Sequence, residues 1–324
     1  MPVMKQPDST NKKSSDKQDI KLQSSGPADW PLALLQGMRP KQWTKNLFVL
    51  VAVVFTNNIP TSLHDHHKWR LLEVSILAFL LYCMVSGSIY LMNDVADRDQ
   101  DRLHPEKRKR PIASGRLPWK LAAVMSVVIG WGGVGLAFLF NMRFGLITLT
   151  YYLLQIAYTY SLKKLVLLDV FTIAAGFVIR AAAGAWAISV PNSVWLLVCT
   201  LQLALFLGFG KRRHELVSLA VNAGKHRRIL SEYSVPFLDQ LISIVLGGLT
   251  VSYAIYTIMS PTAIQHPGLA LTLPFVMYGI FRYLYLIHIQ HKGGSPETIL
   301  LEDRPMQINL LLWMGMVLAA MKGL

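Results

Sequence analysis

Apolar segments alternate with short polar loops over most of this chain, and nine such segments can be counted after the first 45 residues. Most approach the roughly 20 residues that an α-helix needs to cross a bilayer. The first is short, so we expect its helix to begin earlier, near Trp30, with an interruption at Arg39 and Pro40. The pattern predicts an all-α, multi-pass membrane protein with a bundle of about nine transmembrane helices. The segments cover residues 46–59, 71–92, 119–140, 144–161, 165–188, 193–210, 236–259, 268–290 and 305–322.

Residues 1–29 differ from the rest of the chain, because they are polar and contain no aromatic side chain before Trp30. This composition buries too little apolar surface to fold, which predicts a disordered tail. The tail has no apolar core followed by a small-residue cleavage site, so we do not expect a secretory signal. Residues 30–324 are expected to form one membrane-embedded domain.

The balance of charge narrows the class of partner. The chain is 53% hydrophobic and 15% charged, and its formal net charge is +14. A basic balance can indicate nucleic acid, but here the basic residues lie in short loops between spans, which favours anionic membrane lipids or phosphate instead. Cys83 and Cys199 both lie inside apolar segments, so neither a disulfide framework nor a metal–thiolate site is expected.

The distribution of Lys and Arg among the loops predicts the orientation in the membrane. The regions around 189–193 and 260–267 contain neither residue. Basic residues are retained in the cytoplasm during insertion, so we expect the charged face and the amino terminus to be cytoplasmic in a cell inner (plasma) membrane. The two most basic loops carry Arg98, Arg102, Lys107, Arg108, Lys109, Arg110, Arg116 and Lys120, and then Lys211, Arg212, Arg213, Lys225, Arg227 and Arg228.

The segment 93–115, NDVADRDQDRLHPEKRKRPIASG, follows the second span directly and carries the clearest chemistry. On a continuing helix, Asp94, Asp97 and Asp101 occupy positions i, i+3 and i+7, which is one face. Together with Asn93 they offer oxygen ligands of the kind that Mg²⁺ prefers, and Mg²⁺ completes its shell with water and substrate phosphates. The cations at 107–110 suit phosphate. The alternative is a solvated helix end followed by charges that set topology.

Further polar residues fall on the same face. The sequence RPKQWTKN supplies Arg39, Lys41 and Lys45 beside Trp43, although it is also typical of an interfacial anchor. The loop after the sixth span, with KRRHEL and HRRILSEYS, can form an amphipathic cap over the site or carry topology-setting charge alone. The last loop, SPETILLEDRP, is more typical of a solvated turn.

The sequence YTYSLKKLVLLDV leads into a fifth span that contains both Asp169 and Arg180. These two residues are eleven positions apart, or about three helical turns, and therefore point the same way. Ionisable residues inside a membrane usually face a polar cavity. We expect Asp169 near the metal or a ribose hydroxyl, and Lys163 or Lys164 near a phosphate. The alternative is a structural ion pair within the bundle.

The nine spans, the NDxxDxxxD pattern and the following RPIASG resemble the UbiA superfamily of intramembrane prenyltransferases. The resemblance covers nearly the whole chain after the tail, and it implies a helical bundle with a cytoplasmic cap over a central cavity. In that superfamily a second aspartate-rich DxxxD motif occupies the loop after the sixth span. This chain departs from the pattern there, because its loop contains no paired aspartates.

The departures resemble one branch of the superfamily, the decaprenyl-phosphate phosphoribosyltransferases of the actinobacterial cell-wall pathway. This likeness is carried by RPKQWTKN, HPEKRKRPIASG, LKKLVLLDV, the loop with KRxxE and HRxxLxxYS, and DRPMQ. It implies a Mg²⁺-dependent pentosyltransferase, a glycosyltransferase that moves a 5-phosphoribosyl group from 5-phosphoribosyl 1-diphosphate to a polyprenyl phosphate. Diphosphate would leave, and the product would serve the synthesis of cell-wall arabinan. A homo-oligomer is left open.

The resemblance and the loop chemistry together define the expected site. Asp94, Asp97 and Asp101 are expected to be catalytic and, with Asn93, to hold Mg²⁺ against the donor's diphosphate. The acceptor phosphate is already an anion, so no dedicated general base is expected, and catalysis would rest on positioning and electrostatics. The expected substrate contacts are Lys41, Lys45, Asn93, Arg108, Arg110, Tyr160, Lys163, Asp169, Arg180, Lys211 and Arg212.

Two other functions are compatible with a polytopic membrane protein. A UbiA-type prenyltransferase acting on an aromatic acceptor, such as a quinone or tetrapyrrole precursor, would need the missing second aspartate motif. A transporter predicts charges near the bilayer centre and repeated halves. Here the charges gather at one face and no internal repeat is evident.

Overall fold

The structure is a computed structural model that describes residues 26–55, 64–104, 106–219, 228–290 and 302–322. Helices make up nearly all of these residues, and no strand occurs among them. The all-α fold expected from the apolar segments is therefore confirmed. Most of the expected tail, up to residue 25, lies outside the described residues, so its disorder stays a prediction.

The first apolar segment is folded in pieces. Arg39 interrupts it with a φ of 54°, in a left-handed region that few residues other than glycine adopt. The Trp43 indole donates a hydrogen bond across this break to the Met38 carbonyl, at 3.1 Å. The interruption expected at Arg39 and Pro40 is therefore present. The pieces are η1 (Pro27–Asp29), α1 (Trp30–Gly37), η2 (Pro40–Leu50) and α2 (Val51–Phe55).

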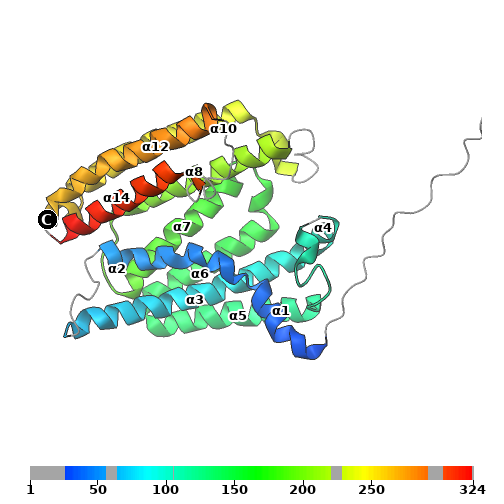
Figure 1. Ribbon diagram of the computed structural model, residues 1–324. Coiled ribbons are helices and arrows are strands. Elements are labelled where there is room, and N and C mark those ends of the chain that lie inside the picture. Colours follow the sequence, from blue (N-terminus) through cyan, green and yellow to red (C-terminus); the bar gives the residue numbers. More distant parts are fainter. Residues whose placement is uncertain (1–25, 56–63, 105, 220–227, 291–301, 323–324) are drawn as a thin grey trace, which may run out of the picture.

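The other apolar segments form long helices that run roughly along one direction (Figure 1). Asn141 separates α5 from α6 and caps the second of them, because its side chain accepts the Phe144 amide at 2.8 Å. The tight hairpin at this point gives the two helices opposite directions. The long helices are α3 (His66–Ala96), α5 (Trp119–Phe140), α6 (Met142–Tyr160), α7 (Leu168–Ala187), α8 (Val194–Leu219), α10 (Val235–Met259), α12 (Leu273–His288) and α14 (Arg304–Met321). Shorter elements are α4 (Arg98–Leu103), η3 (Lys107–Lys109), η4 (Leu162–Lys164), η6 (Arg228–Glu232), α11 (Pro261–Gln265) and η7 (Pro267–Thr272).

The two largest buried apolar clusters both include residues of α7. One cluster joins α3, α5 and α6, with Ala182 and Ala183 of α7. The other joins α8, α10 and α12, with Val170 and Ala174 of α7. Small side chains let α7 lie between the two groups of helices, where membrane helices gain stability from close packing. Helix α7 therefore packs against both groups of helices.

Gly184 shows how tight this packing is. A Cβ atom at Gly184 would lie 1.9 Å from the carbonyl oxygen of Val49, so only glycine lets η2 approach α7 here. The broken first segment is thereby held against the central helix, and Arg39 is brought back toward the end of α3.

Six of the described helices are long and apolar enough to cross a membrane: α3, α5, α7, α8, α10, and η7 continued by α12. The η2–α2 segment, α6 and α14 coincide with predicted apolar segments but are not among these six. An integral membrane fold is supported, whereas the count of nine spans and the cytoplasmic cap over a central cavity stay predictions.

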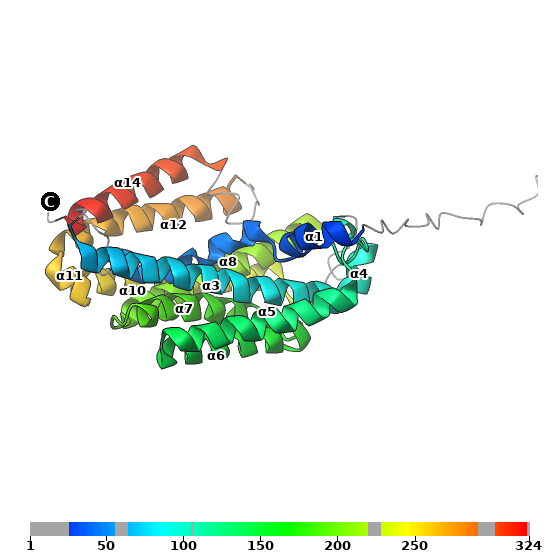
Figure 2. The ribbon, with the colours of Figure 1, turned by 90° about the horizontal axis from the view of Figure 1, so that it is seen from below.

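The polar connections gather at one end of the bundle, which we call the charged end. It comprises α4 with η3, the turn around η4, the C-terminal end of α8, and η6 (Figures 1 and 2). The opposite end holds α11 and the C-terminus of α14 (Figure 2). This grouping agrees with the sequence, in which the two most basic loops are expected on the same face.

Candidate active site at the charged end

The aspartate motif spans the junction between α3 and α4. The Asp97 amide donates to the Asn93 carbonyl and the Asp101 amide to the Asp97 carbonyl, both at 2.9 Å, so the helical register continues through the junction. Asp94 and Asp101 are both buried, and both contact Arg110. Nη1 of Arg110 donates to Asp94 at 3.1 Å and to Asp101 at 2.5 Å. The structure thus brings these two predicted carboxylates together with one predicted cation.

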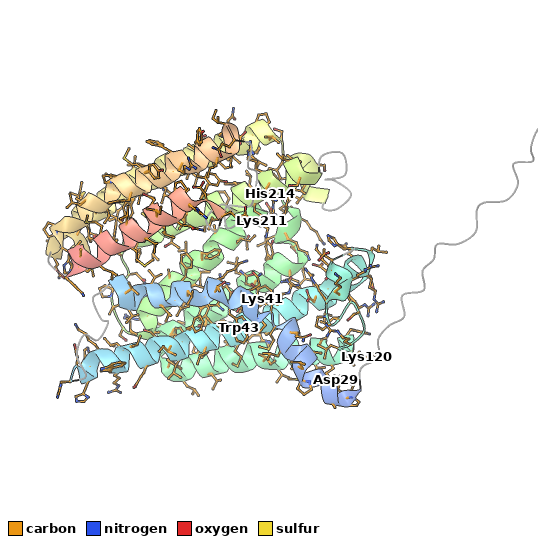
Figure 3. All side chains as sticks on the ribbon, viewed as in Figure 1. Asp29, Lys41, Trp43, Lys120, Lys211 and His214 are labelled. Atoms are coloured by element: carbon orange, nitrogen blue, oxygen red, sulfur yellow. The ribbon has the colours of Figure 1, made fainter. Side chains whose placement is uncertain are left out.

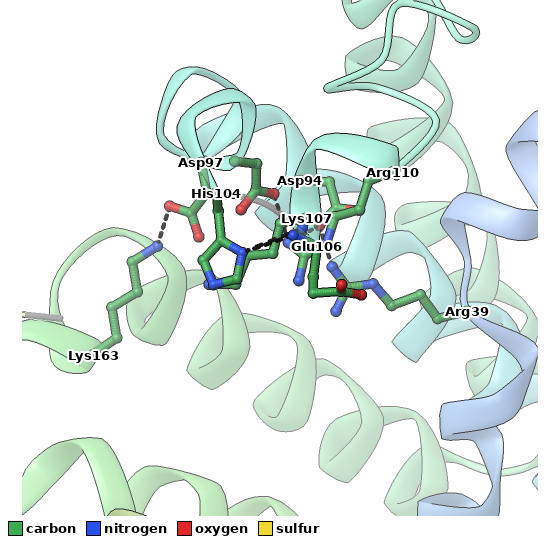
Figure 4. A network of polar contacts seen from close by, with 9 residues as sticks. Arg39, Asp94, Asp97, His104, Glu106, Lys107, Arg110 and Lys163 are labelled. Carbon is green, nitrogen blue, oxygen red and sulfur yellow. Dashed lines mark hydrogen bonds and ion pairs between the residues drawn. The ribbon is translucent and has the colours of Figure 1, made fainter. Parts of the chain in front are cut away.

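A second guanidinium reaches Asp94 from the broken first segment. Arg39 donates to the same carboxylate oxygen of Asp94 that Arg110 contacts (Figure 4). The Arg39 guanidinium also lies 5.2 Å from the centre of the Tyr90 ring. Arg39 belongs to the RPKQWTKN sequence but is not among the substrate contacts expected from the sequence. Its contact depends on the positive φ between α1 and η2, which sequence spacing does not reveal.

Asp97 has a different partner. Its carboxylate accepts a hydrogen bond from Nζ of Lys163, at 2.7 Å, in a contact that joins α3 to the η4 turn (Figure 4). Lys163 was expected near a phosphate, and the structure places it beside the acidic motif. Residues 66 positions apart in the chain are therefore neighbours at the charged end.

The turn after α4 presents the cations that follow the aspartates. Nδ1 of His104 accepts the Glu106 amide at 3.2 Å and the Lys107 amide at 3.4 Å, which folds the segment back toward α3 (Figure 4). Arg110 points inward from this turn, whereas Arg108 is exposed. Of the two arginines expected here, only Arg110 is seen on the aspartates.

The fit of this site to a divalent cation rests on its donor atoms. Asp94 and Asp101 turn carboxylate oxygens toward a shared positive charge, and oxygen donors are what Mg²⁺ takes. Among the described residues, no group of three or more His, Cys, Asp and Glu side chains is arranged to hold a metal ion. Asp97 contacts Lys163, whereas Asp94 and Asp101 both contact Arg110. The residues fit the chemistry of the ion, while joint ligation by all three aspartates stays a prediction.

A second acid–base cluster lies between the start of α7 and the end of α8. Nε of Arg212 donates to Asp169 at 2.8 Å, and Nη1 of Arg212 donates to Glu215 at 2.9 Å. The Tyr233 hydroxyl donates to the other oxygen of Asp169, also at 2.8 Å. Burial raises the pKa of Tyr233 to about 12, so the hydroxyl keeps its proton near neutral pH. Tyr233 is not among the site residues expected from the sequence.

Arg180 does not pair with Asp169, so the ion pair considered for these two residues is wrong. The hydrogen bonds of Arg180 go to the side chain of Asn46 at 2.9 Å, the Tyr151 hydroxyl at 2.6 Å and the Gly176 carbonyl at 2.9 Å. Asp169 instead finds Arg212 on a neighbouring helix. Two side chains on one face of a helix can each pair with residues of neighbouring helices. The spacing of residues along one helix does not reveal such partners.

The remaining expected residues differ in how far solvent reaches them. Lys41 at the start of η2 and Lys211 on α8 are exposed, and Figure 3 labels both. Tyr160 is exposed at the end of α6, and Lys45 and Asn93 are half-buried. Their roles as substrate contacts stay predictions.

Comparison with known proteins identifies the family to which this chain is similar. Residues 47–311 match the model of the UbiA prenyltransferase family. A decaprenyl-phosphate phosphoribosyltransferase from Mycolicibacterium smegmatis is 33% identical over 303 residues, which is 89% of this chain and 92% of that protein. The enzyme of the same name from Mycobacterium tuberculosis is 29% identical over 91% of this chain and 96% of its own length.

Solved structures agree on the fold. A UbiA homologue from Archaeoglobus fulgidus, bound to GPP and Mg²⁺, has a TM-score of 0.65 at 17% identity. The likeness covers 90% of this chain and 99% of that one. At this identity the comparison supports the shared helical architecture.

Proposed function

The chain belongs to the UbiA prenyltransferase family, and we propose that within it the chain transfers a 5-phosphoribosyl group from 5-phosphoribosyl 1-diphosphate to a polyprenyl phosphate. The observation that carries this proposal is the mixed charge of the site. Arg39, Arg110 and Lys163 are interleaved with the aspartates at distances of direct contact. A donor with a diphosphate and a 5-phosphate needs anion-binding groups of this kind beside an oxygen-ligand site.

The relatives support the choice of substrate class. Proteins named decaprenyl-phosphate phosphoribosyltransferases align with this chain over about nine-tenths of its length. The segment that follows the sixth apolar run also favours this class over an aromatic prenyl acceptor. It lies at the end of α8 and holds Arg212 and Glu215, whereas the aromatic prenyltransferases are expected to have paired aspartates there. The product would supply cell-wall arabinan synthesis, as in the branch that the sequence resembles.

The proposed metal site consists of Asn93, Asp94, Asp97 and Asp101, which would hold Mg²⁺. When bound, the ion supplies positive charge that stabilises the departing diphosphate. The Mg²⁺ present in the Archaeoglobus fulgidus homologue supports a divalent ion in this fold.

The cations of the site have their own part in binding the donor. Arg110 and Lys163 now neutralise Asp101 and Asp97, and the phosphates of the donor are alternative anionic partners for them. An exchange of this kind would free carboxylate oxygens in the same event that binds substrate. Guanidinium groups suit it because they contact phosphate and carboxylate oxygens with the same geometry.

The reaction needs little acid–base chemistry from the protein. An oxygen of the acceptor phosphate would attack C1 of the ribose as the bond from C1 to the diphosphate oxygen breaks, and in-line attack predicts inversion at C1. The acceptor is already an anion near neutral pH, so positioning and electrostatic stabilisation suffice. The polyprenyl tail would leave laterally between helices into the bilayer.

A substrate assay tests this function. Purified protein in detergent or vesicles would be given each pairing of donor (phosphoribosyl diphosphate or a prenyl diphosphate) with acceptor (polyprenyl phosphate or 4-hydroxybenzoate). Mass spectrometry of the extracted lipid should show a polyprenyl phosphate with an added phosphoribosyl group. Prenylated 4-hydroxybenzoate without any phosphoribosylated lipid would contradict the proposal and favour the aromatic prenyltransferase.

We further propose that the charged end faces the cytoplasm, since phosphoribosyl diphosphate is a soluble anion that does not cross the inner membrane. A single cysteine near Gly115 should then resist an impermeant thiol reagent in intact cells, whereas one near Pro267 should react. Cys83 and Cys199 would be replaced first. Labelling near Gly115 from outside would reverse the orientation and rule out the donor at that end.

A further inference from the structure

The turn that leads from η4 into α7 has an unusual backbone at Leu167. Its φ is 67° and its ψ is −45°, a combination that crowds the Cβ atom of an L-residue. The Leu168 amide donates to the Val166 carbonyl at 2.8 Å, which closes a γ-turn of the rarer, positive-φ hand. Leucine in such a turn persists only where the surroundings hold it in place.

Tyr233 supplies the group that holds the turn. Its hydroxyl accepts the Leu167 amide at 2.8 Å and donates to Asp169 at 2.8 Å. Asp169 is fixed on its other oxygen by Arg212, so the hydroxyl has a rigid acceptor. The Tyr233 ring is buried, which limits its freedom to leave this position. One hydroxyl thus connects the segment after α8 to the turn before α7.

The same turn determines where Lys163 lies. Backbone hydrogen bonds from the Leu165 amide to the Leu162 carbonyl, at 3.1 Å, and from the Asp169 amide to the Leu165 carbonyl, at 3.0 Å, run without a gap from η4 into α7. Only four positions separate Lys163 from Leu167. A change in the γ-turn would therefore shift the η4 backbone and the contact between Lys163 and Asp97.

We propose that Tyr233 is a positioning residue for the candidate active site. Its hydroxyl holds the γ-turn at Leu167 and thereby keeps Lys163 opposite Asp97. The inference rests on the proposed function, in which Lys163 and Asp97 serve the donor. Tyr233 would touch neither substrate nor metal and would act through the turn. Its loss should therefore impair use of the phosphoribosyl donor and leave the KM for the lipid acceptor unchanged.

The experiment compares four variants with the parent protein, using full-length chains. Tyr233→Phe removes the hydroxyl, and Leu167→Gly lets the turn adopt a positive φ without steric crowding. The double variant combines the two, and Leu167→Gly alone is its reference. Tyr253→Phe is the matched control, because it removes another hydroxyl of an inward-facing tyrosine, one that bonds to Thr272 at 2.8 Å and Trp313 at 2.9 Å in a different part of the bundle. Initial rates would be measured at varied donor and at varied acceptor concentration.

Tyr233→Phe should lower kcat/KM for the donor by about tenfold or more, as expected when a hydrogen bond to a charged group is lost. Tyr253→Phe should behave like the parent protein. The double variant should regain much of the lost activity, because glycine no longer needs the hydroxyl to hold the turn. A purely structural role for Tyr233 predicts equal changes for both substrates and no recovery with Leu167→Gly.

The proposal is overturned if Tyr233→Phe matches Tyr253→Phe, or if Leu167→Gly restores nothing to it. If Tyr233→Phe fails to fold, the double variant should still fold, and failure of both would also overturn the proposal. The parent protein distinguishes this outcome from failure of the proposed function. If the parent uses a prenyl diphosphate and not phosphoribosyl diphosphate, the donor assignment is wrong, while the same four variants still test the turn with that donor.

Discussion

Two acid–base clusters lie at the charged end, and they differ in how far solvent reaches their cations. In the aspartate-motif cluster, the side chains of Arg39 and Arg110 are 28% and 27% exposed. In the α7–α8 cluster, Arg212 is 3% exposed and Asp169 is fully buried. The first cluster shares its cations among several carboxylates, whereas the second is closed by the Tyr233 hydroxyl.

This difference separates contacts that can exchange partners from contacts that hold the fold. A partly exposed guanidinium loses little interaction free energy when a phosphate replaces a carboxylate, because water and the new anion both compensate its charge. A desolvated pair has no such substitute, and removing one partner leaves a buried charge without compensation. We therefore expect the cations of the first cluster to bind the donor and the buried Arg212–Asp169 pair to determine stability, while the Tyr233 hydroxyl acts on the first cluster through the turn at Leu167.

The largest expected effect is on the closed cluster. Asp169→Asn removes the charge that neutralises Arg212 and weakens the acceptor for Tyr233, so it should destabilise the fold by about 3 kcal/mol. Glu215 stays beside Arg212 and limits the loss. The melting temperature of the detergent-solubilised protein would measure the effect.

Asp239→Asn provides the matched control for this prediction. Asp239 also pairs with an α8 arginine, Arg213, at 2.5 Å, but both side chains of that pair are more exposed. Its melting temperature should fall less. Equal shifts for the two variants would mean that burial does not set the strength of these pairs.

The next effect is on activity. Asp97→Asn should lower kcat/KM by about 100-fold or more, as expected when a charge that serves the metal-bound diphosphate is lost. Its melting temperature should stay close to that of the parent protein, since the pair with Lys163 is partly exposed. Initial rates with and without added Mg²⁺, and after chelation, would measure the effect.

Chelation provides an independent check on the same cluster. Excess chelator should abolish turnover, and Mg²⁺ should restore it. Full activity in the presence of chelator would contradict the proposed metal site. Arg39, Arg110 and Lys163 would then be the groups that bind the donor's phosphates.

Much of this arrangement could be predicted from the sequence, within limits set by how helices meet. Helical period alone placed Asp94 and Asp101 on one side, and both are found on Arg110. Spacing within α7 could not identify Arg212 as the partner of Asp169, because that choice depends on where α8 crosses α7. The sequence predicts a break at Arg39 and Pro40, but not the left-handed backbone at Arg39 on which its contact with Asp94 depends.

A smaller effect is expected from a change in shape at constant charge. Arg110 contacts two carboxylates through one nitrogen, and its remaining N–H groups extend in a fixed plane. Lysine keeps the charge but cannot reproduce that geometry, so Arg110→Lys should lower kcat/KM by about tenfold. Initial rates at varied donor concentration would measure it.

Arg282→Lys is the matched control for this substitution. Arg282 contacts both oxygens of Asp303, at 3.2 and 2.9 Å, between α12 and α14. It is a paired arginine that lies outside both clusters, and its replacement should leave the kinetics close to those of the parent. A similar fall in activity for both variants would point to a general effect on folding.

The smallest effect is expected within the aspartate motif itself. Asp99 lies on α4 between two proposed metal ligands, yet it is exposed and turns toward Arg98, whose guanidinium donates to it at 3.0 Å. That hydrogen bond lowers the pKa of Asp99 below its usual value, so the carboxylate is ionised throughout the neutral range and adds no titration there. Exposed ion pairs of this kind contribute little free energy, and Asp99 contacts neither Arg110 nor Lys163. Asp99→Asn should therefore change kcat/KM by less than about twofold and leave the pH dependence of kcat/KM unaltered. Parallel pH–rate profiles of Asp99→Asn and Asp97→Asn would test the contrast. A large loss in Asp99→Asn would show that negative charge on α4 matters in general, and the distinction between inward-facing and exposed aspartates would no longer explain the site.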